Sequence, residues 1–332
     1  MKIIAEIAQA HDGSLGIAHS YINALAETGV DAIKFQTHIA EAESSIHEPF
    51  RTNFSYEDKT RIEYWKRMEF TLEQWEGLKK HCDDKNIEFI SSPFSNAAVD
   101  LLEKIGVERY KIGSGEINNF LLLKKIAETG KPIILSSGMS SFSELDKTLE
   151  FLQKFDNSLS ILQCTTAYPT TPEQWGLNVI TELKKRYEMP VGFSDHSGDI
   201  YACLAATALG AEILEFHTVF DKQMFGPDAK ASLSIDEVKR LVRGVREIKL
   251  SLSHEIDKNE NSQFEDLKNI FEKSLAVNKN LKRGSVLQFS DLEAKKPKGL
   301  GINASEYDCV IGKKINKDLK KWEFLKTNHL HE

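Results

Sequence analysis

The sequence predicts an α/β fold, namely a (β/α)8 TIM barrel followed by a small β-rich domain. Eight short runs rich in β-branched residues alternate with stretches of helical apolar spacing over roughly 230–250 residues, which matches such a barrel in size and order. Glycines precede several of these runs, where a helix can end in a left-handed turn. An open, doubly wound sheet is the alternative, but the count of eight and the absence of an early GxGxxG motif favour the barrel.

The predicted strands cover residues 2–7, 32–36, 87–91, 109–112, 132–136, 160–163, 190–193 and 212–216. Residues 17–26 illustrate the helical spacing of apolar side chains between them. A charged helical stretch at about 235–272 then predicts a linker. We therefore predict a barrel domain at 1–272 and a small domain at 273–332. In the small domain we expect short strands at residues 274–277, 284–287 and 309–311.

One predicted connection, residues 37–69, is much longer than the others. It is rich in histidine, glutamate, serine, arginine and aromatic residues. A long connection after a barrel strand predicts a lid or a specificity loop. Thr71 is expected to cap the following helix, with Gln74 completing a capping box. We expect His38 to lie on the surface and Trp65 to be a packing residue.

The composition excludes several classes of protein. The chain has 332 residues, 41% of them hydrophobic and 28% charged, with a formal net charge of −7. This is typical of a soluble globular enzyme and argues against a nucleic-acid partner. The sequence contains neither an apolar run of membrane-spanning length nor a signal peptide, so we expect a cytoplasmic protein without a membrane partner. Four cysteines without CxxC spacing predict reduced thiols.

Polar side chains follow most of the predicted strands, at the end of the barrel where such folds hold their chemistry. Lys34 and Lys111 lie in the second and fourth strands, and serines or threonines follow several others. A lone lysine at a strand end is more often structural. Two of them among hydroxyl groups predict a pocket for a phosphate, since lysine supplies charge and hydroxyl groups supply directional hydrogen bonds.

Two further constellations predict catalysis. Lys111, Ser114 and Glu116 lie within six residues around two glycines, which suits proton transfer on an anionic substrate. The alternative is an ordinary loop with a surface lysine. His196 and His217 end the seventh and eighth strands and could share a divalent cation that keeps open positions. Imidazole favours Mn²⁺, Fe²⁺, Co²⁺ or Zn²⁺, and a site completed by oxygen ligands could use Mg²⁺. Two hydrogen-bonding histidines are the alternative.

A series of motifs along the whole chain resembles the sialic acid synthase family. The motifs are Ile4-Ala-Glu6, His11-Asp-Gly13, Ala32-Ile-Lys-Phe-Gln-Thr37, Ser92-Pro-Phe94, Tyr110-Lys-Ile-Gly-Ser-Gly-Glu116, Ser137-Gly-Met139, Gly192-Phe-Ser-Asp-His196 and Gly226-Pro-Asp228. Members of this family make nine-carbon α-keto acids such as N-acetylneuraminate, legionaminate and pseudaminate. The tail from Ser274 resembles the family's C-terminal domain, which is similar to type III antifreeze proteins (the SAF fold).

The resemblance implies that phosphoenolpyruvate condenses with an N-acetylated hexosamine (N-acetylmannosamine or a 2,4-diacetamido hexose), and that phosphate leaves by C–O cleavage. Glu116 would handle the proton of the water that adds at C2, and His196 and His217 would bind Mn²⁺ or Mg²⁺. The residues implied to hold phosphoenolpyruvate are Lys34, Ser92, Lys111, Ser114, Ser136 and Ser194. Those implied on the metal and sugar side are Gln36, Asp228 and two catalytic residues, Glu6 and Tyr168.

Two positions depart from the family pattern. Thr166 stands where asparagine is usual, and Lys296 stands where an arginine usually reaches the partner subunit's sugar. Lysine keeps the charge but loses the bidentate fork. The resemblance also implies a domain-swapped homodimer. Outside this family, a Schiff-base aldolase using Lys111 or Lys34 and a non-catalytic sugar-binding protein are the alternatives.

Overall fold

The structure is a computed structural model that describes residues 1–52 and 54–331. The chain forms two compact units, Met1–His254 and Glu255–Glu332. The boundary between them falls within residues 235–272, the stretch predicted as a linker. Helix α10 (Ile235–Leu252) therefore belongs to the N-terminal unit, and α11 (Glu265–Phe271) belongs to the C-terminal unit.

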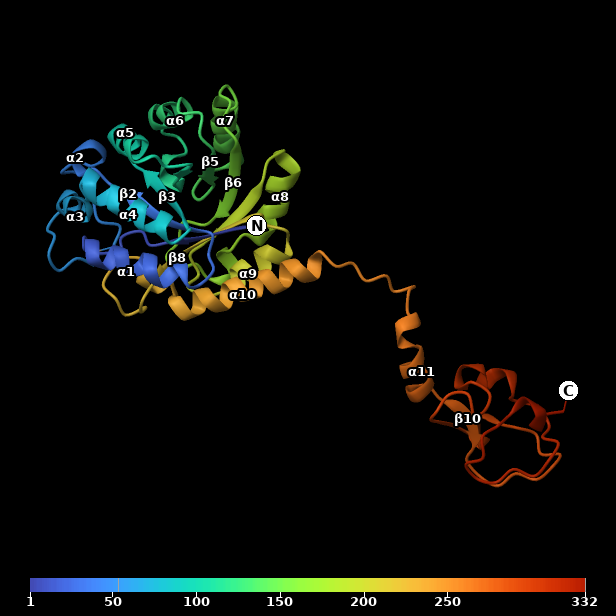
Figure 1. Cartoon of the computed structure of the whole chain (residues 1–332). Coiled ribbons are helices and arrows are strands. Elements are labelled where there is room, and N and C mark those ends of the chain that lie inside the picture. The colour runs from blue at the N-terminus through green and yellow to red at the C-terminus, as the bar shows by residue number, and fades with distance from the viewer. Residues whose placement is uncertain (53, 332) are drawn as a thin grey trace. The chain divides into compact units, whose positions relative to one another are not determined.

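The N-terminal unit is a closed parallel barrel (Figure 1). Neighbouring strands pair in sequence order, and β1 also pairs with β8, with Glu6 opposite His217. This closure confirms the predicted barrel and excludes the open sheet. The strands are β1 (Lys2–Glu6), β2 (Ala32–Thr37), β3 (Glu88–Pro93), β4 (Tyr110–Ile112), β5 (Ile133–Ser136), β6 (Leu159–Cys164), β7 (Val191–Asp195) and β8 (Ile213–Val219). A short strand, β9 (Leu233–Ser234), pairs with the end of β8.

Helices surround the barrel, and their starts follow local capping chemistry. At the start of α4, the Thr71 hydroxyl accepts a hydrogen bond from the backbone N–H of Gln74. The side-chain oxygen of Gln74 in turn accepts one from the backbone N–H of Thr71, so the predicted capping box is confirmed. Gly106 ends α5 in the left-handed region, with φ 76° and ψ 48°. The helices that precede α10 in this unit are α1 (Leu15–Ala26), α2 (Ala40–Glu43), α3 (Arg61–Met68), α4 (Leu72–Asp84), α5 (Asn96–Ile105), α6 (Phe120–Ala127), α7 (Phe142–Leu152), α8 (Leu177–Arg186) and α9 (Tyr201–Ala208).

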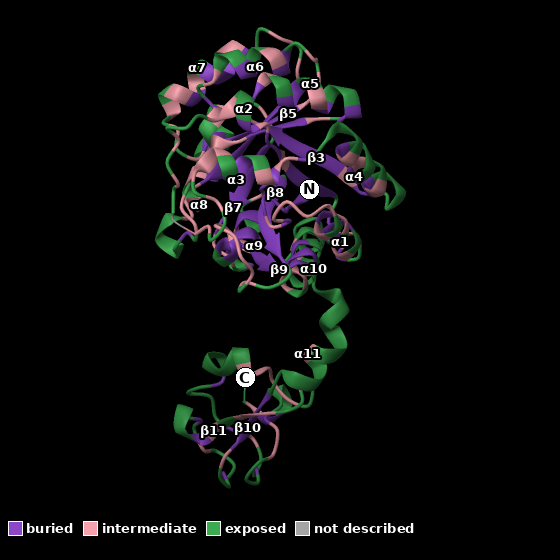
Figure 2. Cartoon of the chain, turned by 90° about the vertical axis from the view of Figure 1, so that its left-hand side faces the viewer, coloured by how far each residue is buried: buried purple, intermediate pink, exposed green. Residues whose placement is uncertain are grey.

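Alternation along the strands separates two buried layers. Ile3 and Ala5 pack with helix residues such as Tyr21, whereas Ile4 belongs to a small separate cluster. Figure 2 shows the barrel strands as buried and the surrounding helices as partly exposed. The small cluster consists of Ile4, Ala32, Ile90, Ile134, Leu162 and Ile213. Two residues after each of these, on the same face of the strand, come Glu6, Lys34, Ser92, Ser136, Cys164 and Glu215. The inner cluster therefore forms a hydrophobic floor beneath a ring of polar side chains.

The long 37–69 connection is folded against the barrel. It contains α2 and α3, and the α3 side chains Tyr64, Trp65 and Met68 form a buried cluster with Ala40. Arg67 anchors this segment because its guanidinium binds Asp58 at 2.8 Å and also pairs with Asp12 after β1. The predicted loop is thus a structured wall beside the strand ends.

The C-terminal unit contains one antiparallel pair, β10 (Ser274–Val277) and β11 (Leu292–Lys295). The strand predicted at 274–277 is confirmed. The prediction of a strand at 284–287 is wrong, since Val286 makes only an isolated bridge. The prediction at 309–311 is also wrong, because a 3-10 turn, Ala304–Cys309, ends there. No helix of the described chain is long and apolar enough to cross a membrane.

Candidate active site

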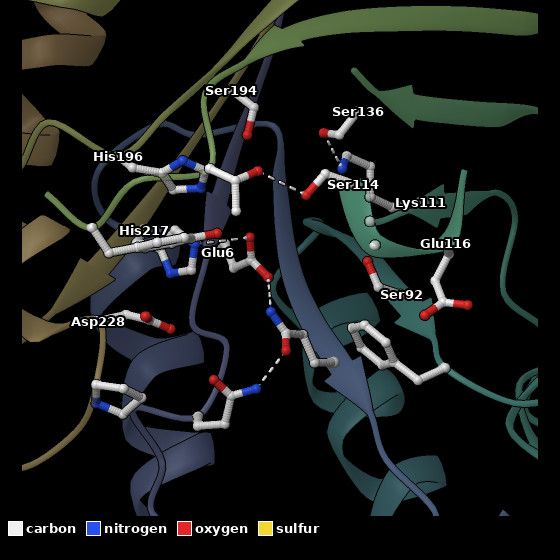
Figure 3. A pocket seen from close by; sticks show the side chains of 18 of the residues that line it. Glu6, Ser92, Lys111, Ser114, Glu116, Ser136, Ser194, His196, His217 and Asp228 are labelled. Atoms are coloured by element: carbon white, nitrogen blue, oxygen red, sulfur yellow. Dashed lines mark hydrogen bonds and ion pairs between the residues drawn. The ribbon is translucent and has the colours of Figure 1, made fainter. Parts of the chain in front are cut away.

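A cavity of about 370 Å³ opens at the C-terminal ends of the barrel strands. All the predicted site residues of the barrel line it: Glu6, Lys34, Gln36, Ser92, Lys111, Ser114, Glu116, Ser136, Thr166, Tyr168, Ser194, His196, His217 and Asp228. Figure 3 shows many of them converging from different strands and loops. The inner floor of the barrel closes the cavity below, and the 37–69 segment forms part of its wall.

Two lysines and two carboxylates form a buried cluster at the base of the cavity. Lys34 Nζ lies 2.6 Å from Glu6 Oε1 and 3.8 Å from Glu215 Oε2, and Lys111 Nζ lies 3.4 Å from Glu215 Oε1. Lys111 also donates to Ser136 Oγ at 2.7 Å. All four charged side chains are no more than 4% exposed. The cluster is balanced at two positive and two negative charges, so an added anion would give it a net negative charge.

The two lysines respond differently to their surroundings. Burial lowers the pKa of the Lys111 ammonium, and the charge of Glu215 only partly opposes this effect. Burial also disfavours the charged form of Lys34, but Glu215 and Glu6 outweigh it and raise the pKa of Lys34. Lys111 is therefore the lysine whose charge a bound anion would stabilise most.

The loop after β4 places hydroxyl groups and a carboxylate above this cluster. Ser114 Oγ lies 3.1 Å from Thr166 Oγ1, and both residues line the cavity. Gly138 is required beside them: its φ is +26°, and a Cβ there would lie 2.0 Å from the Ser114 Cβ. This close approach fixes the positions of the two hydroxyl groups.

Glu116 is half-buried at the opposite edge of the cavity from the histidines (Figure 3). Asn119 Nδ2 donates to its Oε2 at 2.7 Å. Burial raises the pKa of Glu116 above its ordinary value, and the hydrogen bond from Asn119 only partly offsets this. A carboxylate with a raised pKa next to an anion pocket is suited to accept a proton near neutral pH.

The other side of the cavity holds the two histidines. The ring centroids of His196 and His217 are 5.2 Å apart, and His217 Nε2 lies 3.4 Å from Glu6 Oε2. His196 Nδ1 bonds to the Thr165 carbonyl at 2.9 Å, which orients the ring. Burial lowers the pKa of His196 to about 3, so the imidazole is neutral at physiological pH. Burial likewise raises the pKa of Tyr168, which keeps this phenol a proton donor.

These donors fit a divalent cation. A neutral His196 offers a nitrogen lone pair, His217 faces the same space, and the Glu6 carboxylate lies beside it. Within residues 1–52 and 54–331, no group of three or more His, Cys, Asp or Glu side chains forms a ready-made metal site. Two imidazoles alone would leave positions for water and substrate oxygen, as a catalytic metal requires.

Several lining residues were not among the predicted site residues. Glu215 lies two residues before His217 on the same face of β8, so parity along this strand places it at the site, but no role was predicted for it. Arg51 pairs with Asp228 at 2.6 Å, and its guanidinium lies 4.1 Å from the centre of the Tyr168 ring. Only the length of the loop indicated this wall in advance. The 37–69 segment contributes five further lining residues that were not predicted: His38, Glu43, Glu48, Arg61 and Trp65.

Two expectations need separate comment. His38 is only 4% exposed, so its prediction as a surface residue is wrong: it is stacked against Trp65 and Phe94, at centroid distances of 3.8 and 4.6 Å. Lys296 belongs to the C-terminal unit, where its Nζ lies 4.7 Å from the centre of the Phe271 ring. Its role toward a sugar stays a prediction.

The family follows from comparison with known proteins. A model described as the NeuB family matches residues 21–257. The chain belongs to the NeuB family. This NeuB chain is 36% identical to the N,N'-diacetyllegionaminic acid synthase of Campylobacter jejuni over 330 residues, which cover 98% of both chains. It is 33% identical over 320 residues to human N-acetylneuraminate-9-phosphate synthase, covering 94% of this chain and 88% of that one.

A solved structure agrees. The crystal structure of N-acetylneuraminic acid (sialic acid) synthetase from Leptospira borgpetersenii, in complex with citrate, matches with a TM-score of 0.70. The two chains are 33% identical, and the match covers 80% of this chain and 90% of that one. The resemblance noted from the sequence motifs is therefore confirmed.

Proposed function

We infer that this NeuB family protein is a phosphoenolpyruvate-dependent synthase of nine-carbon sugar acids. It condenses phosphoenolpyruvate with an N-acylated amino hexose and releases phosphate. The observation that carries this inference is one cavity that joins a buried lysine pair with hydroxyl groups to a histidine pair and a carboxylate. Within the family, legionaminate and pseudaminate synthesis are the variants that differ from N-acetylneuraminate synthesis in the amino sugar.

The lysine side of the cavity suits phosphoenolpyruvate. Lys34 and Lys111 would donate charge-assisted hydrogen bonds to its carboxylate and phosphate, and Lys111 already donates to Ser136. Hydroxyl groups from four strands or loops would add directional hydrogen bonds: those of Ser92, Ser114, Ser136 and Ser194. Phosphate binding should stabilise the charged form of Lys111 against the effect of burial.

The histidine side suits the open-chain sugar aldehyde. Mn²⁺ or Mg²⁺ held by His196 and His217 would supply a Lewis acid at the aldehyde oxygen. Tyr168 remains a protonated donor near these rings, with its ring centroid 4.2 Å from that of His196. Gln36 donates to Glu6 at 2.7 Å, and both, together with Asp228, would bind sugar hydroxyl groups or orient the groups that do.

The reaction can be written with each bond accounted for. C3 of phosphoenolpyruvate forms a bond to the aldehyde carbon as the C2=C3 double bond opens, and the aldehyde oxygen takes up a proton to become a hydroxyl group. Water adds at the electron-poor C2 while Glu116 accepts one of its protons, because burial raises the pKa of that carboxyl group. The tetrahedral carbon then loses phosphate by cleavage of its C–O bond while its new hydroxyl group gives up its proton, leaving the α-keto acid.

A substrate panel tests this function. Purified protein with phosphoenolpyruvate and Mn²⁺ should release phosphate with at least one of N-acetylmannosamine and the 2,4-diacetamido hexoses. Chelation of the metal should stop this release. No release with any member of the panel would contradict the proposed function, and mass spectrometry of the product would name the sugar.

A Schiff-base aldolase remains a second candidate, because the pKa of Lys111 is lowered, as in lysines that act as nucleophiles. Its amino group is, however, already bonded to Ser136 and paired with Glu215. Borohydride in the presence of substrate would trap a covalent adduct on Lys111 under the aldolase mechanism. Under the synthase mechanism no adduct should form.

We also propose a cytoplasmic, domain-swapped homodimer in which Lys296 reaches the sugar in a neighbouring subunit. The separate core of the C-terminal unit, formed by residues such as Leu275 and Ile315, supports an independently folded module. Lys296→Ala should raise the KM for the sugar without changing the dimeric mass measured by light scattering. A monomeric mass for the active wild-type enzyme would contradict this proposal.

A further inference from the structure

A buried hydrogen-bond relay runs from the 37–69 segment to the base of the cavity. Glu43 Oε1 lies 2.6 Å from His38 Nδ1, and His38 Nε2 lies 3.0 Å from Gln9 Nε2. Gln9 Nε2 also bonds to Gln36 Oε1, and Gln36 Nε2 donates to Glu6 Oε1 at 2.7 Å. All five residues line the cavity, and neither the resemblance nor the lysine and histidine clusters assigns a role to Gln9, His38 or Glu43.

The two ends of this relay determine its polarity. Glu6 is paired with Lys34 at 2.6 Å, so its carboxylate can only accept, and Gln36 must turn its amino group toward it. The Gln36 carbonyl oxygen then faces Gln9, which must present its own amino group. That amino group lies between Gln36 Oε1 and His38 Nε2, which are 3.2 Å apart, and it can donate one N–H to each of them, with His38 Nε2 then the acceptor.

The other end requires the same arrangement. His38 Nδ1 faces Glu43, whose carboxylate oxygen accepts a hydrogen bond from the N–H on this nitrogen. The proton on Nδ1 leaves Nε2 as the acceptor that Gln9 needs. Two carboxylates thus bracket a central amino group, and a flip of either amide would set two donors or two acceptors against each other.

One polar group on each amide is left over. Gln9 retains its carbonyl oxygen and Gln36 retains one N–H, and neither makes another hydrogen bond within the described part of the chain. We propose that Glu43 and His38 are positioning residues that hold Gln9 and Gln36 as a fixed acceptor–donor pair for one hydroxyl group of the acceptor sugar. This inference rests on the proposed function, and it deepens that function by naming how the sugar is selected.

A hydroxyl group suits such a pair because it donates and accepts at the same time. A site built to bond a hydroxyl group rejects an analogue that lacks it, since its own polar groups are then left unpaired. One monodeoxy analogue of the acceptor sugar should therefore bind much more weakly than the parent, and this preference should depend on His38.

The test uses His38→Phe, which keeps an aromatic ring between Trp65 and Phe94 but removes both nitrogens. Calorimetry in the presence of Mn²⁺ would measure the binding of the amino sugar that the substrate panel identifies, here called the parent sugar, and of its monodeoxy analogues. We expect the parent to bind about 10-fold more weakly in the variant, the loss of roughly one hydrogen bond. The wild type should bind the parent sugar much more tightly than one monodeoxy analogue, and in the variant this affinity ratio should fall to within about 2-fold. Phosphoenolpyruvate affinity should stay unchanged.

Two further variants make the result decisive. Glu43→Leu keeps the His38 ring and removes the acceptor at Nδ1, so it should weaken the same preference even if His38→Phe folds poorly. His47→Phe makes the same change at an exposed histidine of the same segment and should behave as wild type. Equal weakening of all sugars and of phosphoenolpyruvate, an unchanged preference in both variants, or no sugar binding by the wild-type protein would overturn the proposal. Phosphate release by the wild type is scored separately and tests the proposed function itself.

Discussion

Replacement of Glu116 by glutamine removes the proposed base with little other change. Glutamine has nearly the same size, and its carbonyl oxygen can still accept the hydrogen bond that Asn119 Nδ2 makes at 2.7 Å. The lysines and serines that would hold phosphoenolpyruvate are untouched. General base catalysis contributes about 10²- to 10⁴-fold, so kcat should fall by that factor, or about 2.7–5.4 kcal/mol in the barrier. The KM for phosphoenolpyruvate should stay within about threefold, since no binding contact is lost.

The assay is steady-state phosphate release at saturating sugar, with phosphoenolpyruvate varied and pH scanned. Because burial raises the pKa of Glu116, the wild-type kcat/KM should fall as pH drops through that raised value. Asn119→Ala removes the hydrogen bond that lowers this pKa, so it should move the acidic limb to still higher pH. Glu128→Gln, at an exposed helix end, is the matched control. A kcat for Glu116→Gln within tenfold of wild type would refute the role of this carboxylate.

Three further perturbations probe the two sides of the cavity. Lys111→Met removes charge-assisted bonds worth about 1.5–3 kcal/mol and should raise the KM for phosphoenolpyruvate about 10- to 150-fold; an unchanged KM would place the anion elsewhere. His196→Ala should abolish metal-stimulated phosphate release while circular dichroism stays that of the wild type, and full activity would remove the histidines from the metal site. Gly138→Ala should displace Ser114 and weaken phosphoenolpyruvate binding about 10-fold or more, which calorimetry would measure; normal affinity would show that this contact is unimportant.

The barrel was predictable because its strands carry local signals. All eight predicted strands overlap those of the structure, with ends that differ by no more than three residues. Because side chains alternate along a strand, Lys34 and Gln36 share one face of β2, and Glu215 and His217 share one face of β8. A parallel barrel brings strand ends together whatever the details of packing, so most of the candidate site followed once the fold was inferred.

The remainder depended on contacts that no local pattern encodes. The path of the 37–69 segment decides that Arg51 meets Asp228 and that His38 is buried. In the C-terminal unit, β11 (Leu292–Lys295) was missed because Leu292-Glu-Ala-Lys295 contains no β-branched or aromatic residue, although apolar and charged residues alternate along it. The incorrect strands near Val286 and Cys309 were short apolar runs that the structure uses in a bridge and a turn.

The fate of one oxygen atom tests the central claim most directly. Phosphoenolpyruvate labelled with ¹⁸O at the atom joining C2 to phosphorus would be incubated with the enzyme, Mn²⁺ and the accepted amino sugar. Cleavage of the C–O bond predicts that the released phosphate carries the label and that the sugar acid does not, as mass spectrometry of both products would show. Label retained in the keto acid, or no sugar acid formed at all, would contradict the account.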